Sequence, residues 1–277
     1  MKLKDRVALI TGAGSGLGRE IALQMAKEGA KIGVNDINPQ GITETLKAIE
    51  GAGSTGIALE ADVGNVSQVE DMFEKLKSTW QTIDILVNNA GISAFPSWTD
   101  YNEYVNAAYL KATNEVMTYG KTQESMKFTS SFKDEYWHAM LNVHLNGTFY
   151  CTREALKIME EKRSGKIINM ASICGMHGCS GAPSYSAAKG AIIAFTKSVA
   201  LEVIGSGILV NAVAPGYIDT PLLDNLLPEV KALISARKPV GRFGRPEEIA
   251  SMVVYLASDE ASFIVGQVIS PNGGMFV

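Results

Sequence analysis

The sequence lacks several features that would point to particular classes of protein. Its 277 residues carry a formal net charge of −4, and lysine and arginine are scattered rather than clustered. A protein of this charge is poorly suited to bind nucleic acid or an anionic membrane. No apolar run reaches the length of a membrane span, and the apolar stretch from Val7 leaves no room for a signal peptide. These absences predict a soluble, cytoplasmic protein with no nucleic-acid or membrane partner.

Cysteine is also scarce. The chain contains three, Cys151, Cys174 and Cys179, which is an odd number without metal-ligand spacing. We expect all three to be reduced thiols, as is usual in the cytosol, and we expect no metal site.

What the sequence does contain is a regular alternation of β-rich and helical segments. The expected strands are 7–11, 30–36, 55–61, 83–91, 165–172, 208–215 and 266–274, and the expected helices include one ending at Gly29 and those at 39–52, 66–80, 134–162, 184–204 and 246–257. Several strands are continuous apolar runs, which is typical of a sheet covered by helices on both faces. With no linker or repeat, the pattern predicts an α/β, single-domain Rossmann fold with a doubly wound parallel sheet over 1–277.

The first strand runs into a glycine loop and then into a helix. Its glycines follow the pattern T-G-x-x-x-G-x-G at Thr11, Gly12, Gly16 and Gly18, and Leu17 stands where the generic G-x-G-x-x-G needs its last glycine. In this context the loop places backbone N–H groups and a helix N-terminus against a phosphate, although a tight turn would also use glycine.

Asp36 lies at the end of the second expected strand, roughly 20 residues past the glycines. A carboxylate there accepts hydrogen bonds from both ribose hydroxyls of NAD and repels a 2′-phosphate. Ser15 is neutral, so the loop offers no phosphate-binding cation. The alternative is that Asp36 is only a turn residue before Asn38. The pattern favours NAD over NADP.

Further motifs follow in order: Asp62-Val63, Asn88-Asn89-Ala90-Gly91, Ser172, Tyr185-x-x-x-Lys189 and Pro215-Gly216. The chain resembles the short-chain dehydrogenase/reductase family over nearly its whole length. The resemblance implies an NAD-dependent oxidoreductase acting on CH–OH groups, and a homotetramer built through the two long helices and the C-terminal strand. It also implies a set of cofactor-binding residues: Gly12, Ser15, Gly16, Leu17, Gly18, Asp36, Ile37, Asp62, Val63, Asn89, Ala90, Gly91, Tyr185, Lys189, Pro215, Gly216, Ile218 and Thr220.

Tyr185 and Lys189 lie four positions apart, so they share one face of a helix. A free tyrosine, with a pKa of about 10, is a poor base at neutral pH. A nearby ammonium and the positive nicotinamide ring favour the phenolate, so we expect Lys189 and the cofactor to lower the pKa of Tyr185. With the resemblance, these residues predict Tyr185 as the acid/base, Lys189 as its activator and Ser172 as the donor to the substrate oxygen.

The chain departs from the family at His144, which stands in "HLNGTF" where many members carry an asparagine. We include His144 among the catalytic candidates. Three roles are open: a backbone contact, a proton relay by a group that titrates near neutrality, or plain packing.

A second departure is a segment at approximately 97–133, about 30 residues longer than a compact family member needs. Its apolar residues fall at helical spacing, from Tyr101 to Tyr119. Because it follows the fourth strand, it could cover the substrate cleft, form a subunit-contact arm, or be a passive insertion.

The segments that frame the expected substrate pocket are mostly apolar. The candidate substrate contacts are Ser172, Tyr185, Phe95, Ile173, Met176, His177 and Tyr217. They favour a hydrophobic, cyclic or aromatic secondary alcohol or its ketone. The alternatives are a 3-hydroxyacyl-CoA or 3-oxoacyl thioester as substrate and, in another class, a nucleotide-sensing or scaffold protein without chemistry.

Overall fold

A parallel sheet forms the centre of the molecule. The computed structural model describes residues 1–93, 99–224, 226–236 and 238–276. Its seven-stranded sheet has the order β3-β2-β1-β4-β5-β6-β7, with every pairing parallel. The strands are β1 Val7–Ile10, β2 Lys31–Asp36, β3 Gly56–Glu60, β4 Ile85–Asn88, β5 Gly165–Met170, β6 Ile208–Val213 and β7 Val268–Ile269. The predicted Rossmann fold is confirmed, and the change of direction between β1 and β4 is the point where such sheets bind ligands.

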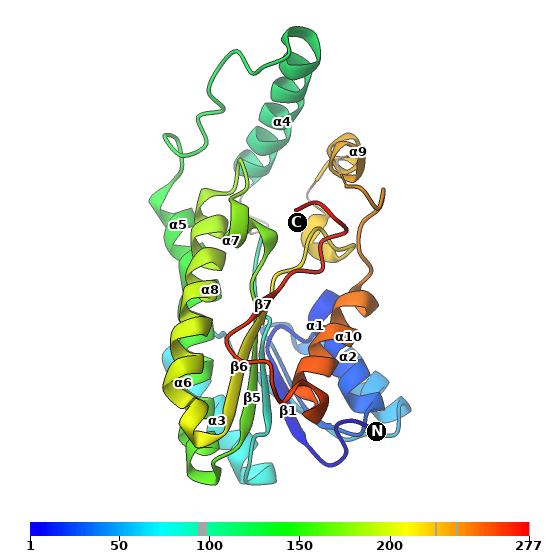
Figure 1. Cartoon of the computed structure of the whole chain (residues 1–277), viewed down its shortest axis with the longest axis vertical. Coiled ribbons are helices and arrows are strands. Elements are labelled where there is room, and N and C mark those ends of the chain that lie inside the picture. Colours follow the sequence, from blue (N-terminus) through cyan, green and yellow to red (C-terminus); the bar gives the residue numbers. More distant parts are fainter. Residues whose placement is uncertain (94–98, 225, 237, 277) are drawn as a thin grey trace.

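Helices cover both faces of the sheet (Figure 1). They are α1 Gly16–Lys27, α2 Pro39–Gly51, α3 Val66–Trp80, α4 Thr99–Tyr119, α5 Asp134–Leu141, α6 Gly147–Lys162, α7 Ile173–His177, α8 Pro183–Val203, α9 Pro228–Ala236 and α10 Pro246–Ala257. The helices α1, α2 and α10 lie on one face, and α3, α6 and α8 lie on the other. Buried aliphatic side chains fill both layers, which explains the continuous apolar strands. Within the described ranges, no helix is long and apolar enough to cross a membrane.

Two predicted elements differ from the structure. The single helix expected over 134–162 is interrupted by a π-helical turn at Asn142–Asn146, where Thr148 Oγ1 donates to the carbonyl of His144 at 2.7 Å. The last strand is only Val268–Ile269 rather than 266–274, because it pairs with β6 alone at the sheet edge and Pro271 has no N–H to extend the ladder.

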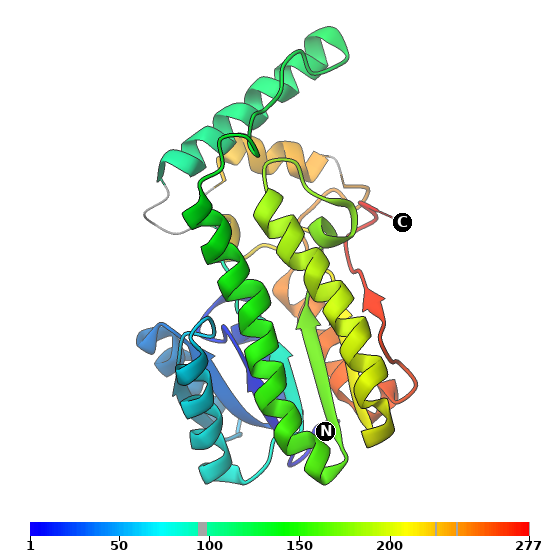
Figure 2. The same cartoon turned by 90° about the vertical axis from the view of Figure 1, so that its left-hand side faces the viewer.

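The segment predicted as an insertion contains α4 and the chain that returns to α5. Figures 1 and 2 show α4 beyond the carboxyl ends of the strands, at the same end of the sheet as α9. That edge of the sheet also carries α7 and the start of α8.

Candidate active site

A cavity of about 540 Å³ lies at the carboxyl ends of the strands. Every one of the predicted cofactor-binding residues, from Gly12 to Thr220, lines it. The topology therefore gathers loops that are far apart in sequence into one site, although their roles toward a cofactor stay predictions.

The glycine loop passes close under the end of β4. Gly12 has φ +64°, and a Cβ atom there would lie 2.8 Å from Cα of Ala90. The hydroxyl of Thr11 accepts hydrogen bonds from the backbone N–H groups of Asn89 (2.9 Å) and Ala90 (3.0 Å). The α1 helix starts at Gly16, inside the cavity wall. A glycine-rich loop and a helix N-terminus facing the same cavity fit a pyrophosphate.

Asp36 is held at the other side of this loop. Its carboxylate accepts from the N–H of Gly14 (2.9 Å) and from the N–H of Asn38 (3.0 Å). The nearby Arg19 is already engaged, because its guanidinium donates to the carbonyl of Gly14 in this loop and pairs with Glu44 at 2.9 Å. The local charge facing the cavity is therefore negative.

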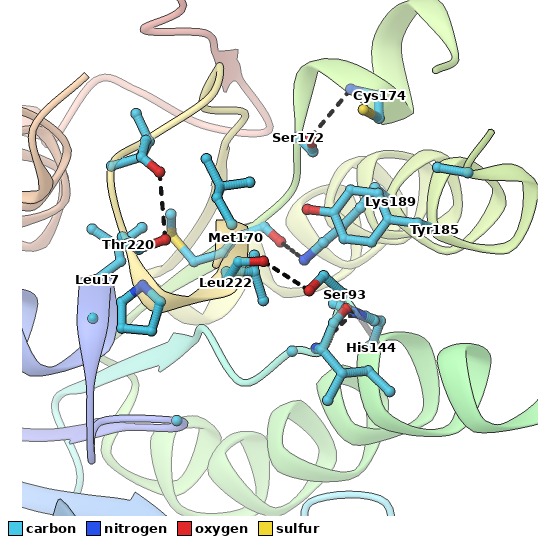
Figure 3. Close-up of a pocket in the computed structure, with 18 of the residues that line it drawn as sticks. Leu17, Ser93, His144, Met170, Ser172, Cys174, Tyr185, Lys189, Thr220 and Leu222 are labelled. Atoms are coloured by element: carbon cyan, nitrogen blue, oxygen red, sulfur yellow. Dashed lines mark hydrogen bonds between the residues drawn. The ribbon is translucent and has the colours of Figure 1, made fainter. Parts of the chain in front are cut away.

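Ser172, Tyr185 and Lys189 meet in the middle of the cavity (Figure 3). Ser172 ends the segment after β5 and caps α7, since its Oγ accepts from the N–H of Cys174 at 3.1 Å. Tyr185 and Lys189 both come from α8, with Lys189 Nζ 5.7 Å from the tyrosine ring centroid. Lys189 is 4% exposed, and its Nζ donates to the carbonyl of Met170 at 2.6 Å. The three predicted catalytic residues Ser172, Tyr185 and Lys189 therefore line the same part of the cavity.

Burial shifts the pKa values of both Tyr185 and Lys189. Burial raises the pKa of Tyr185, and the hydrogen bond with Ser172 opposes that effect without reversing it. Burial lowers the pKa of Lys189 to about 7. In the protein groups alone desolvation of the phenolate dominates, so a lowered pKa of Tyr185 beside Lys189 and the positive nicotinamide ring stays a prediction.

His144 is 2% exposed and lies beside Tyr185. Its Nε2 lies 3.1 Å from the backbone nitrogen of Ile92 and 2.8 Å from the carbonyl oxygen of that residue. Burial, and then the charge of Lys189, lowers the pKa of His144 to about 3. A histidine with this pKa is neutral near pH 7, which argues against the relay role, whereas the backbone-contact and packing roles stay predictions.

The two asparagines that flank His144 bond elsewhere. Asn142 Nδ2 donates to the carbonyl of Gly64, and Asn146 Nδ2 donates to Asn142 Oδ1, both at 3.1 Å. Neither amide takes the place of His144 beside Tyr185.

The expectation of three reduced cysteines is wrong for two of them. Cys174 and Cys179 form a disulfide, and Cys151 is a buried free thiol. The short helix α7 turns the chain back so that the two Cα atoms lie 4.9 Å apart. Both disulfide cysteines line the cavity. Two cysteines five residues apart were visible in the sequence, but their approach depends on this turn.

The predicted substrate contacts divide into two groups. Ile173 and Tyr217 line the cavity together with Ser172 and Tyr185. Met176 is 44% exposed, and His177 stacks on Phe276 with ring centroids 4.0 Å apart. Neither belongs to the cavity wall, because only the first turn of α7 faces it. Phe95 lies outside the described residues.

The sequence offered a cover of the substrate cleft as one role for the insertion, but it did not single out the asparagines of one cavity wall. Five residues of α4 line it: Tyr101, Asn102, Val105, Asn106 and Tyr109. The helical spacing from Tyr101 to Tyr119 indicated the helix, but its polar residues carried no signal because asparagine in a surface helix is ordinary.

Known proteins resemble this chain over its whole length. A sequence model described as short chain dehydrogenase matches residues 6–231. The chain is 35% identical to a 3-oxoacyl-[acyl-carrier-protein] reductase of Thermotoga maritima, covering 100% of both chains. It is 36% identical to a cis-4-hydroxycyclohexanecarboxylate dehydrogenase of Sinomonas cyclohexanicum, covering 98% of this chain and 96% of that one.

A third relative and a solved structure agree with these matches. The chain is 34% identical to the (2S)-[(R)-hydroxy(phenyl)methyl]succinyl-CoA dehydrogenase subunit of Thauera aromatica, covering 99% and 98% of the two chains. A short-chain type dehydrogenase/reductase from Mycobacterium marinum superposes with a TM-score of 0.84 at 29% identity, covering 99% and 96%. The chain therefore belongs to the short-chain dehydrogenases, oxidoreductases that act on CH–OH groups with a nicotinamide cofactor.

Proposed function

We propose that the protein is an NAD-dependent dehydrogenase that transfers a hydride between NAD and a hydrophobic, cyclic or aromatic secondary alcohol or its ketone. The observation that carries this proposal is the meeting of Ser172, Tyr185 and Lys189 in a cavity whose other end holds Asp36. All three groups that the reaction needs are present, which argues against a sensing or scaffold protein without chemistry.

The chain's own residues move and hold the proton of the reaction. When bound, the nicotinamide accepts or donates the hydride. Tyr185 exchanges the hydroxyl proton of the substrate, and Ser172 donates a hydrogen bond to the same oxygen. Lys189, with a pKa of about 7 and its Nζ directed by the Met170 carbonyl, is protonated in part near neutral pH and then favours the tyrosine phenolate.

Two observations support NAD rather than NADP. The carboxylate of Asp36 lines the cavity at the end of β2, where we expect the adenine ribose, and Arg19 is engaged by Glu44. A phosphate in a confined site beside a carboxylate is unfavourable without a free cation.

An apolar cavity wall supports a hydrophobic substrate. The aliphatic and aromatic residues that line the substrate side are Ile92, Val105, Ile173, Tyr217, Leu222, Leu226, Val230 and Ile234. Among the described residues that line the cavity, Lys189 is the only lysine or arginine.

The second candidate is a 3-hydroxyacyl-CoA or 3-oxoacyl thioester. The names of two relatives, one acting on an acyl-carrier-protein thioester and one on a CoA thioester, favour it. The scarcity of cations along the described wall disfavours it, because coenzyme A and the carrier arm bring phosphates.

We also propose a homotetramer in the cytoplasm. Exposed apolar side chains on α6 and α8, including Phe149 (44% exposed) and Leu201 (80% exposed), support an interface between copies of the chain.

The test is the rate of nicotinamide absorbance change with NAD or NADP, across cyclic and aryl secondary alcohols and 3-hydroxyacyl-CoA esters. We expect turnover with NAD and the small alcohols. Tyr185→Phe should keep NAD binding, measured by calorimetry, while turnover collapses. Retained turnover in that variant would overturn the mechanism, and turnover confined to the thioesters would establish the second candidate.

A further inference from the structure

The first half of the helix α4 forms a wall of the cavity. Tyr101, Asn102, Val105, Asn106 and Tyr109 line the cavity, and this spacing places them on one side of the helix. In Figures 1 and 2 the helix lies past the strand ends, near α9.

One edge of α4 is fastened to the segment after the disulfide. The hydroxyl of Tyr101 donates to the carbonyl of Gly181 at 2.8 Å, and the hydroxyl of Tyr109 donates to the carbonyl of Ser180. Tyr101 also packs against Tyr136, in a cluster that includes Tyr185. These contacts bring α4 to the reacting end of the cavity.

The other edge of α4 is fastened to the segment that leads into α9. The side-chain oxygen of Asn106 accepts from the N–H of Leu227 at 3.3 Å, and its Nδ2 donates to the backbone carbonyl of Asn102. Asn106 is therefore used in holding the wall and is 7% exposed.

Asn102 differs from Asn106 in this respect. It is half-buried at the cavity wall, one residue from Tyr101, and within the described part of the chain its side-chain amide has no hydrogen-bond partner. A polar group at the wall of a mostly apolar site commonly orients the ligand and sets specificity. An amide both donates and accepts, so a hydroxyl or a carbonyl oxygen would satisfy it.

The charged side chains of the cavity wall restrict which chemical group of a ligand Asn102 can bind. Asp36 and Asp62 lie among the residues predicted to bind the cofactor, and Lys189 is held at the Met170 carbonyl. No other charged side chain belongs to the described cavity wall. The group that Asn102 meets is therefore expected to be neutral, because a carboxylate or phosphate there would lose its water without gaining a cation.

We propose that Asn102 determines substrate specificity by binding a second, neutral oxygen group of a compact cyclic substrate, under a wall held in place by Tyr101, Tyr109 and Asn106. The proposal rests on the proposed function, which supplies the reacting alcohol or ketone. It adds a second oxygen group on the same substrate, away from the reacting carbon.

The test compares three ketones that share one reacting carbonyl. These are cyclohexanone, 4-hydroxycyclohexanone and 4-oxocyclohexanecarboxylate, each reduced with NADH. We expect kcat/KM to be roughly tenfold higher for the hydroxyketone than for cyclohexanone, the effect of one net hydrogen bond. We expect no such gain for the carboxylate.

The variant Asn102→Leu keeps similar volume and removes the amide. We expect it to reduce the hydroxyketone-to-cyclohexanone ratio to about one, whereas Asn114→Leu, at an exposed position of the same helix, leaves the ratio unchanged. A ratio that Asn102→Leu does not change, or a preference for the carboxylate, would overturn the proposal.

Binding measurements test the specificity proposal independently of the proposed function. Calorimetry with the NADH complex of Tyr185→Phe measures affinity without turnover. If none of the ketones is reduced by the unmodified enzyme but the hydroxyketone binds in an Asn102-dependent manner, the proposed function fails and the specificity proposal stands. If cyclohexanone is reduced and the hydroxyketone binds no better than cyclohexanone, the specificity proposal fails alone.

Discussion

The imidazole ring of His144 stands edge-on to the ring of Tyr185, with the centroids 5.2 Å apart and the planes at 90°. The same imidazole occupies the space beside Gly91, where a Cβ atom would lie 2.9 Å from Nδ1. Its Nε2 lies against the backbone of Ile92. His144 thus links the end of β4 to the proposed acid/base, and it does so as a neutral, buried ring.

We expect the free energy of unfolding of His144→Asn to fall less at acidic pH than that of the unmodified protein. The pKa of His144 is about 3 in the folded protein, against about 6.5 for a free histidine, so the unfolded chain binds more protons between these values. The free energy of unfolding therefore falls as pH drops through this range, and His144 accounts for a loss on the order of 2 to 3 kcal/mol between pH 7 and pH 4.5. Urea unfolding at both pH values measures the loss.

The control for this experiment is His138→Asn, at an exposed histidine of α5. It should keep the acid sensitivity of the unmodified protein. An unchanged loss in His144→Asn would contradict the neutral assignment. Disappearance of a near-neutral limb from the pH profile of kcat would instead support the proton relay.

Gly91→Ala should destabilise the protein by about 1–3 kcal/mol, because the new methyl group overlaps the imidazole of His144. The double variant with His144→Ala should lose less than the sum of the two single variants, since the space is then free. Gly51→Ala is the control, because a Cβ atom there meets nothing within 4 Å. Additive losses in denaturant titrations would show that the two residues do not compete for this space.

Asp36→Ser should raise the NADP-to-NAD ratio of kcat/KM by roughly tenfold, since it removes the charge that opposes a 2′-phosphate. Adding Glu44→Gln should raise the ratio further, because Arg19 then loses its ionic partner. Asp71→Ser, at an exposed position of α3, is the matched control. If NAD preference survives in the double variant, the proposed cofactor selection is wrong.

The disulfide predicts one titratable thiol per chain in denatured, unreduced protein, and three after reduction. Reduction should raise KM for the ketone several-fold, because the Cys174–Cys179 bond tethers the segment whose carbonyls hold Tyr101 and Tyr109. Cys179→Ser should show the raised KM without any response to reductant. Three thiols in unreduced protein would contradict the disulfide and agree with the cytoplasmic expectation of reduced cysteines.

The parallel sheet, the glycine loop and the positions of Asp36, Ser172, Tyr185 and Lys189 could all be predicted from the sequence. These features follow from local rules: the alternation of strands and helices, the need for glycine near a phosphate, and the fact that parallel strands end at one edge. The family resemblance added residues that these rules do not give, such as Thr220, which lines the same cavity as Gly12.

The properties that depend on burial and long-range packing could not be predicted from the sequence. The pKa directions of Tyr185, Lys189 and His144 depend on how completely each is removed from water. The disulfide depends on the turn made by α7. Asn102 became a candidate only when the anchors of α4 placed it at the cavity, because the periodicity of a helix does not tell which surface it will face.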